Sequence, residues 1–276
     1  MQLFRGVAAG AIAAASVLSV APLASAATLR ITVSNLAPEN GNFLTPAWFG
    51  LHDGSFDLYN RNEPITAGLE RLVEDGDIPP LNAEFSAAGG GTVQGAVLGL
   101  EGTAPGPIDP GEVASILVED VDASAESSRY FSYASMVIPS NDFFIANGDP
   151  LAHQIFDDSG NFLGADFIVA GSNVLDGGTE VNDELPETTA FLGQTVADTG
   201  EVEGGGVTLA QGYIPGGNVL SSDDFFNADF TAPGYEVARF QVELVEDDAA
   251  SVPEPGSVLA LMAVGSFLVS RKLKQA

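Results

Sequence analysis

Two acidic segments carry the side chains that could bind a metal ion. Residues 174–183 read VLDGGTEVND, and residues 136–142 read MVIPSND. Calcium takes about six to eight oxygen ligands from carboxylates, carbonyl groups and water, and glycine lets a loop turn its carbonyl groups inward. Asp176 and Glu180 lie on either side of such a glycine turn, and Asp142 offers a third carboxylate from a distant segment. This spacing is compatible with a calcium site built from two loops.

Each acidic segment also has a purely structural interpretation. Acidic glycine turns are common on solvated surfaces, and a carboxylate such as Asp142, close after a proline, often accepts hydrogen bonds from backbone N–H groups. Neither segment has the spacing of an EF-hand loop, and the nearest rival, residues 157–161, lacks the distal glutamate. The residues alone therefore leave both interpretations open.

The overall charge excludes one class of function. The 276 residues include 38 Asp and Glu but only 9 Lys and Arg, which gives a formal net charge of −29. Such a surface repels nucleic-acid phosphates and attracts divalent cations, so nucleic-acid binding is excluded. There is no cysteine, so disulfides, thiolate metal sites and a thiol nucleophile are excluded as well.

The N-terminal segment has the organisation of a secretory signal peptide. Arg5 precedes an apolar run over residues 7–20, and the small residues Ala24-Ser25-Ala26 follow. This order predicts export and cleavage after Ala26. A buried N-terminal helix is the alternative.

The C-terminal segment has three parts in a fixed order. Pro253-Glu254-Pro255 precedes an apolar stretch over residues 257–270, and the basic residues Arg271, Lys272 and Lys274 follow. This arrangement resembles the bacterial PEP-CTERM sorting signal. The resemblance implies processing by an exosortase, membrane contact through the apolar helix before processing, and delivery to the cell surface or extracellular matrix. A plain membrane anchor is the alternative.

The segment between these ends reads as one all-β domain. Short β-branched and aromatic runs alternate with Gly, Pro, Asn and Asp, as in antiparallel β-sandwiches. The predicted strands cover residues 27–36, 46–52, 92–100, 128–139, 162–171 and 236–246. One helix is predicted over residues 65–76, with Leu69, Leu72 and Val73 on its apolar face, and is interpreted as a cover on the sandwich without chemistry of its own. Long loops separate the later strands.

The two acidic segments also resemble a known family. Residues 132–150, with Pro139-Ser140-Asn141-Asp142-Phe143, followed by residues 174–184, are similar to the spondin N-terminal domain shared by F-spondin and mindin. The resemblance implies an antiparallel β-sandwich like those of calcium-dependent membrane-binding domains. It also implies that Ca²⁺ is held at one end of the sandwich by Asp142, Asp176 and Glu180.

These inferences define a domain organisation and a functional expectation. The predicted parts are a signal peptide (1–26), a spondin-type domain (27–246), a linker (247–252) and a sorting signal (253–276). We expect an exported, non-enzymatic calcium-binding protein for adhesion or recognition, with polysaccharide or other surface molecules as partners besides the export machinery and the exosortase. An exported glycan hydrolase that uses carboxylates is the main alternative, and a coat protein without an ion is a third.

Overall fold

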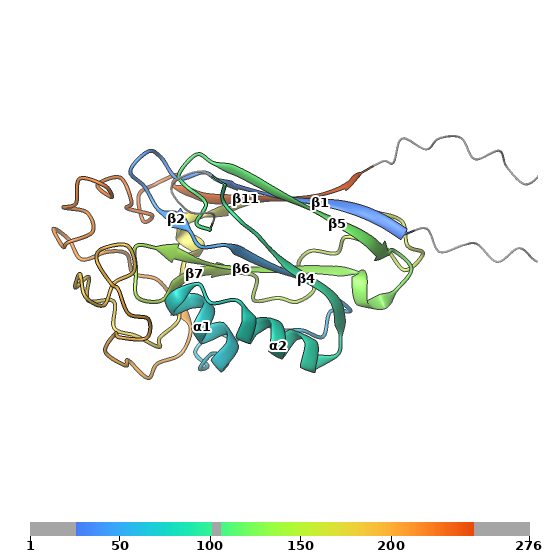
Figure 1. The fold of residues 1–276 in the computed structure, drawn as a ribbon, viewed down its shortest axis with the longest axis horizontal. Helices are drawn as coiled ribbons and strands as arrows, with labels where there is room; N and C mark the ends of the chain where they lie inside the picture. Colours follow the sequence, from blue (N-terminus) through green and yellow to red (C-terminus); the bar gives the residue numbers. More distant parts are fainter. Residues whose placement is uncertain (1–25, 101–105, 246–276) are drawn as a thin grey trace, which may run out of the picture.

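The protein is a sandwich of two antiparallel β-sheets, as the sequence predicts (Figure 1). The computed structural model describes residues 26–100 and 106–245. The first sheet has the strand order β5 (Val113–Asp122), β1 (Ala26–Asn35), β11 (Glu236–Val245), β8 (Ala165–Ala170). The second has the order β10 (Thr208–Leu209), β9 (Leu175–Asp176), β7 (Phe143–Ala146), β6 (Tyr130–Ile138), β3 (Ala47–His52), β4 (Gly91–Val97), and β2 (Phe43–Leu44) pairs with β6.

The six predicted strands correspond to β1, β3, β4, β6, β8 and β11. The structure adds β5, which the sequence analysis did not predict, and the short strands β2, β7, β9 and β10. Two 3₁₀ turns, Glu126–Ser128 and Gly171–Asn173, interrupt the connections. The long predicted loops therefore contain short pieces of regular structure that join the second sheet.

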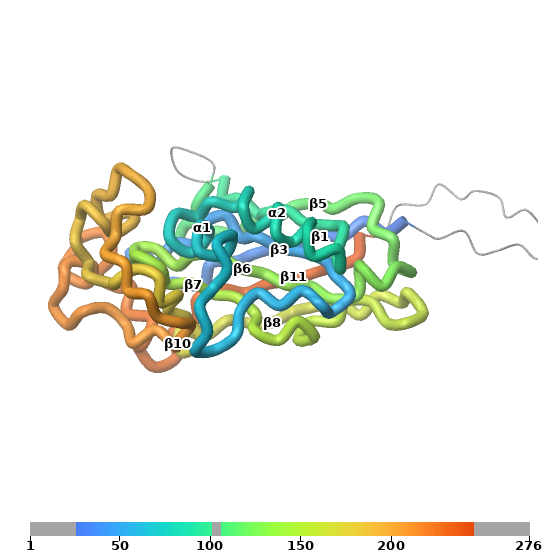
Figure 2. The backbone as a smooth tube through the Cα atoms, turned by 90° about the horizontal axis from the view of Figure 1, so that it is seen from below, coloured from blue at the N-terminus to red at the C-terminus, as the bar shows by residue number. Residues whose placement is uncertain are grey.

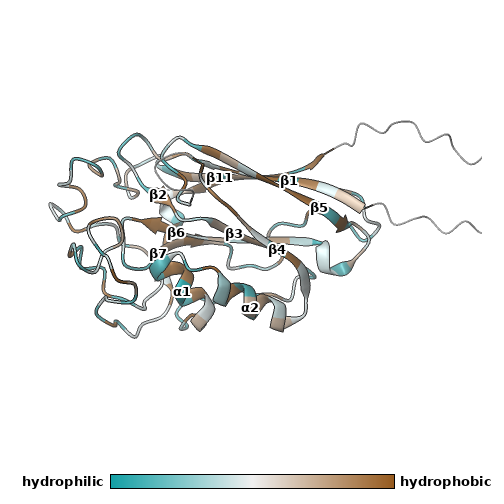
Figure 3. Cartoon of the chain, in the orientation of Figure 1, coloured by the Kyte–Doolittle hydropathy of each residue, from teal (hydrophilic) through white to brown (hydrophobic). Residues whose placement is uncertain are grey.

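The main core lies between the two sheets. In β1, Leu29, Ile31 and Val33 alternate with more exposed residues and are buried, as expected for a strand with one face against a core. The same core contains Phe131 of β6 in the facing sheet and Phe240 of the neighbouring strand β11. Figure 3 shows that apolar residues recur along the strands of both layers.

Two helices cover the outer face of the second sheet (Figure 1). The helix α1 (Ala67–Asp75) begins at Thr66, whose hydroxyl accepts a hydrogen bond from the Leu69 amide at 3.3 Å, and ends at Gly76 with a φ of 68°. This confirms the predicted helix. The second helix, α2 (Pro79–Ala88), was not predicted.

The two helices bury an apolar cluster of their own against the sheet. Trp48 of β3 packs edge-on against Phe85 of α2 with 5.5 Å between the ring centroids, and the apolar face of α1 joins them. Because both faces of the second sheet are covered, every residue of β3 and nearly every residue of β6 is buried.

The two ends of the sandwich differ in structure. β1 and β11 pair antiparallel with Thr28 opposite Val245, so the described chain begins and finishes at one end, here called the terminal end. The long segments 177–207 and 210–235 lie at the opposite end, here called the loop end (Figure 2).

The predicted signal peptide, linker and sorting segment lie outside the described residues, apart from Ala26 at the start of β1. Among the residues that the structure describes, no helix has the length and apolar composition needed to cross a membrane.

Candidate functional site

The predicted site residues lie at the loop end, and the first of them, Asp142, is fully buried between β6 and β7. The preceding turn is fixed by Ser140, whose hydroxyl donates to the Val137 carbonyl at 2.7 Å and accepts from the Phe143 amide at 3.0 Å. The turn therefore directs Asp142 toward the acidic glycine loop. At the start of that loop, β9 pairs with β7 and places Asp176 opposite Phe143.

Asp142 joins the two predicted loops through hydrogen bonds. Its Oδ2 accepts from the Thr179 amide at 2.9 Å, the Thr179 hydroxyl at 3.1 Å and the Glu180 amide at 3.2 Å. Its Oδ1 accepts from the side-chain amide of Asn182 at 2.6 Å. A carboxylate offers about four lone-pair positions, so these four donors satisfy it. The structure brings the two acidic segments together, with Asp142 as the brace between them.

Asp176 lies beside this brace and is half-buried. Its Oδ1 accepts a hydrogen bond from the Gly178 amide at 2.9 Å within the same turn. Burial, followed by the negative charges of Asp142 and Glu203, raises the pKa of Asp176 to about 6. The turn requires glycine at position 178, which has a φ of 68° and lies against the backbone of Gly206.

Glu180 points into a different group of carboxylates. Among the described residues, a ligand oxygen from each of Glu74, Glu180 and Asp198 lies within 4.8 Å of the other two. We call this group the three-carboxylate cluster. Of the three predicted ligands, only Glu180 belongs to it.

The cluster joins α1 to two loop segments. Glu180 is 4% exposed and accepts a hydrogen bond from the Gly200 amide at 2.7 Å. A Cβ atom at position 200 would lie too close to the Glu180 carboxylate, so the Glu180 side chain would have to shift to admit it. Burial raises the pKa of Glu180, and the charges of Asp75, Asp142 and Asp198 raise it further.

Glu74 is the most perturbed carboxylate of the cluster. It is 4% exposed on α1, and burial raises its pKa to about 7, with a smaller effect in the same direction from Glu180. The Thr179 hydroxyl is in hydrogen-bonding reach of both Glu74 and Asp142. One hydroxyl proton can serve only one acceptor. Glu74 and Asp142 therefore compete for the Thr179 hydroxyl proton.

Arg71 is the cation nearest to the cluster. Its guanidinium lies 3.7 Å from the Asp198 carboxylate, 3.9 Å from that of Glu74 and 2.8 Å from that of Asp75. Its strongest contact is therefore with Asp75, outside the cluster. One shared arginine compensates only part of the negative charge gathered at this point.

The sequence patterns did not indicate Glu74 or Asp198 as site residues. Glu74 lies off the apolar face of α1, and the helix was expected to carry no chemistry. It is buried because residues 179–200 pack over that side of α1, a contact that helix periodicity cannot predict. The positive φ of 57° at Asp198 likewise belongs to an irregular loop without a sequence signature.

Comparison with known proteins identifies the C-terminal segment. Residues 251–274 match the PEP-CTERM protein-sorting motif, in agreement with the predicted signal over 253–276. No curated protein matches the chain significantly. The motif indicates an exported protein of the cell envelope that is recognised by an exosortase-type sorting enzyme.

Proposed function

We propose that this exported protein is a non-enzymatic recognition or adhesion module of the cell surface or extracellular matrix, and that it binds calcium at its loop end. The observation that carries the proposal is the approach of Glu74, Glu180 and Asp198 to within 4.8 Å of one another. Carboxylates at this separation repel each other. A divalent cation between them removes the repulsion and takes the hard oxygen ligands that calcium prefers.

A spondin-type domain is part of the same proposal. The antiparallel sandwich agrees with the fold that the resemblance implies. The two motifs that carry the resemblance are adjacent in space, since Phe143 lies opposite Asp176 and Asp142 binds the amides of Thr179 and Glu180. These contacts support a shared architecture of the loop end.

The proposal gives different roles to the predicted ligands. Glu180 binds the ion together with Glu74 and Asp198, whereas Asp142 holds the loop that carries Glu180. Coordination by Asp142 would require it to exchange hydrogen bonds from four donors for the ion. An ion held by Asp142, Asp176 and Glu180, as the resemblance implies, remains a prediction that the same experiment tests.

Calcium binding would also release Arg71 from the cluster. The guanidinium contacts of Arg71 with Glu74 and Asp198 are long, at 3.9 and 3.7 Å, and its 2.8 Å contact with Asp75 can persist. Three carboxylates supply fewer than the about six to eight oxygens that calcium takes. Water or the oxygens of a bound polysaccharide would complete the coordination shell, which is how the ion would contribute to recognition.

The test is a calorimetric calcium titration of the purified protein and its variants. We expect Glu180→Gln, Glu74→Gln and Asp198→Asn each to weaken binding at least tenfold. Glu126→Gln serves as the matched control, because Glu126 is an exposed carboxylate at the terminal end. Asp176→Asn distinguishes the three-carboxylate cluster from the ligand set implied by the resemblance, because Asp176 belongs only to the second. A loss of binding in Asp176→Asn with no change in Asp198→Asn would move the ion to the set implied by the resemblance, and no binding by the wild type would refute the calcium proposal.

A non-enzymatic role is testable on the same variants. A glycan hydrolase would release reducing ends from extracellular polysaccharide, and it would lose this activity when its acid or base is neutralised. We expect no release by the wild-type protein above that of Glu74→Gln. Release that disappears in Glu74→Gln or Glu180→Gln would establish the hydrolase alternative in place of the binding role.

A further inference from the structure

A second concave site lies at the loop end, apart from the three-carboxylate cluster. Four segments that are distant in sequence meet there and enclose a cavity of about 460 Å³. This volume is in the range of sites that hold a small ligand or a single large side chain. Its lining includes Glu39, Phe43, Asp109, Phe191, Asp224 and Phe225. We call this site the aromatic pocket.

Three phenylalanines form the apolar part of the aromatic pocket. The ring of Phe43 lies 5.7 Å from that of Phe191 and 6.0 Å from that of Phe225, centroid to centroid. Phe225 is buried, Phe43 is half-buried and Phe191 is 51% exposed. Phe191 also has a φ of 66°, a backbone conformation that bulky side chains rarely adopt. The fold therefore holds a large aromatic ring at the rim of the pocket.

Three carboxylates share the pocket with these rings. Glu39, Asp109 and Asp224 all belong to its lining, and no lysine or arginine does. In the part of the chain that the structure describes, the ion pairs formed by arginine involve other carboxylates. The pocket thus combines three negative charges with apolar rings and has no positive charge in its lining.

Hydrogen bonds fix two walls of the pocket relative to each other. The Asn40 side chain donates to the Asp223 carbonyl at 3.3 Å, and the Asn227 amide donates to the Asn40 carbonyl at 3.1 Å. The Asn227 side chain donates to the Glu39 carbonyl at 2.8 Å. The segment around residue 40 and the segment around residue 225 are therefore braced together, which keeps Phe43 and Phe225 in position.

We propose that the aromatic pocket binds the side chain of an arginine presented by a basic partner protein. The faces of aromatic rings carry negative electrostatic potential, so they attract a cation, and the carboxylates add direct charge attraction. A guanidinium is planar, stacks on an aromatic face and donates to carboxylates at its edge at the same time. The compact and more strongly hydrated ammonium of lysine gains less from the rings.

The negative charge of the protein favours a basic partner over an anionic one. The chain carries a net charge of −29, and the pocket lining adds to the repulsion of acidic polysaccharides or phosphate groups. The inference deepens the proposed recognition role by naming a class of partner, and it does not depend on calcium. Failure of the calcium proposal and failure of this one are therefore distinguishable when binding is measured with a chelator present.

The probe is a capped Gly-Arg-Gly peptide titrated against the full-length protein in chelator. Matched peptides carry citrulline, the neutral analogue of arginine, or lysine. We expect saturable binding of the arginine peptide, at least tenfold weaker binding of the citrulline peptide and an intermediate affinity for the lysine peptide. Equal binding of citrulline and arginine would overturn the role of charge, and lysine binding as tight as arginine would overturn the assignment to a guanidinium.

Two variants locate the binding in the pocket. Phe191→Ala removes the exposed ring, and Asp224→Asn removes one charge with little change of shape. Each substitution is expected to weaken binding of the arginine peptide at least fivefold. Phe226→Ala is the control, because Phe226 is 54% exposed next to the pocket but does not line it. Because Phe191→Ala could disturb its strained loop, Asp224→Asn provides the independent test, and unchanged binding in Asp224→Asn would refute the proposal.

Discussion

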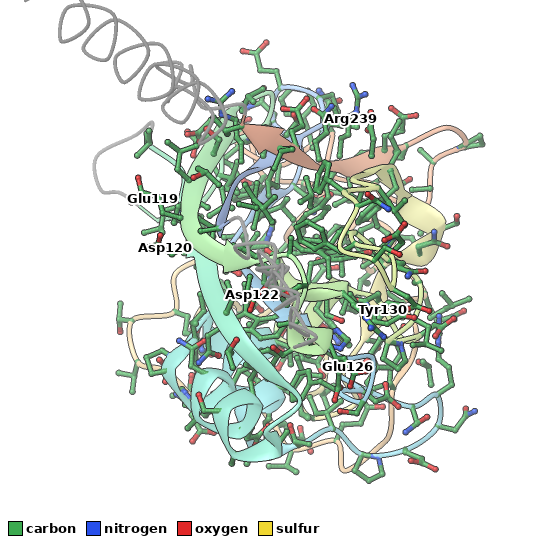
Figure 4. The ribbon with its side chains drawn as sticks, turned by 90° about the vertical axis from the view of Figure 1, so that its right-hand side faces the viewer. Glu119, Asp120, Asp122, Glu126, Tyr130 and Arg239 are labelled. Atoms are coloured by element: carbon green, nitrogen blue, oxygen red, sulfur yellow. The ribbon has the colours of Figure 1, made fainter. Side chains whose placement is uncertain are left out.

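Both ends of the sandwich carry acidic side chains, but those described here are exposed at the terminal end and buried at the loop end. At the terminal end, Glu119, Asp120 and Asp122 of β5 are exposed to solvent, and Figure 4 shows them spread along the strand. At the loop end, Asp142 and Glu180 are buried. A high net charge keeps both ends soluble, but only the buried carboxylates need a specific partner. Burial of acidic groups, rather than their number, therefore distinguishes the loop end from the terminal end.

A second difference lies within the loop end itself. Asp142 is satisfied by four donors, one of them the Thr179 hydroxyl, whereas the three-carboxylate cluster has the Gly200 amide and a shared Arg71. The first arrangement is complete without an ion, and the second is the one at which we propose that an ion binds. The predictions below test this distinction, starting from the complete site.

Asp142→Ala should cause the largest loss of stability. The substitution leaves the amides of Thr179 and Glu180 and the side chain of Asn182 without their acceptor in a buried site. Each unsatisfied buried donor costs about 1–3 kcal/mol, and these costs are not additive, so we expect the free energy of unfolding to fall by about 3–5 kcal/mol. Chemical denaturation measures it. A loss below about 1 kcal/mol would show that Asp142 is not a brace.

Calcium should produce the next largest effect, and the cluster should account for it. An ion that binds only the folded protein adds about 2.7 kcal/mol to the free energy of unfolding at 100 times its dissociation constant. We expect this gain in the wild type and its loss in Glu180→Gln. The same denaturation curves, recorded with calcium and with chelator, provide the measurement. An equal calcium-induced gain in Glu180→Gln would place the ion elsewhere.

These predictions also show what the sequence could establish. The meeting of Asp142 with residues 176–180 was predictable from two motifs that resemble one family. Glu74 was not, because its burial depends on a loop of irregular structure packing over α1. Similarly, α2 escaped prediction because it begins at Pro79 without a side-chain cap, and its stability comes from burying residues such as Phe85. Local patterns predicted six of the strands and one helix, and long-range packing decided the site.

In the presence of chelator, the pH dependence of stability should be a smaller effect than the two above, and it should be assignable to Glu74. Its pKa is about 7 in the folded protein and about 4.5 in the absence of the fold. Between these values the folded protein binds more protons than the unfolded chain, so the free energy of unfolding falls as the pH rises from about 4.5 to about 7. We expect Glu74→Gln to remove much of this decrease.

Other groups titrate in the same range, so the difference between wild type and Glu74→Gln is the quantity to measure. Asp176, with a pKa of about 6, acts in the same direction as Glu74. His52 and His153, whose pKa values burial lowers to about 4, act in the opposite direction, because stability is lost as the pH falls below about 6.5. Glu126→Gln is the control, and a wild-type profile parallel to that of Glu74→Gln would contradict the assignment.

Neutralising the exposed carboxylates should have the smallest effect on stability but a visible effect on association. In the described residues, β5 pairs with β1 alone, so its other edge presents unpaired backbone groups. Charged side chains on such an edge oppose pairing with another copy. We expect Glu119→Gln combined with Asp120→Asn to change the free energy of unfolding by less than about 0.5 kcal/mol and to increase self-association at high protein concentration. Sedimentation velocity over a concentration series measures the association. If the double variant stays as monodisperse as the wild type, the charges of the terminal end serve solubility without protecting the β5 edge, and the contrast between the two ends reduces to burial alone.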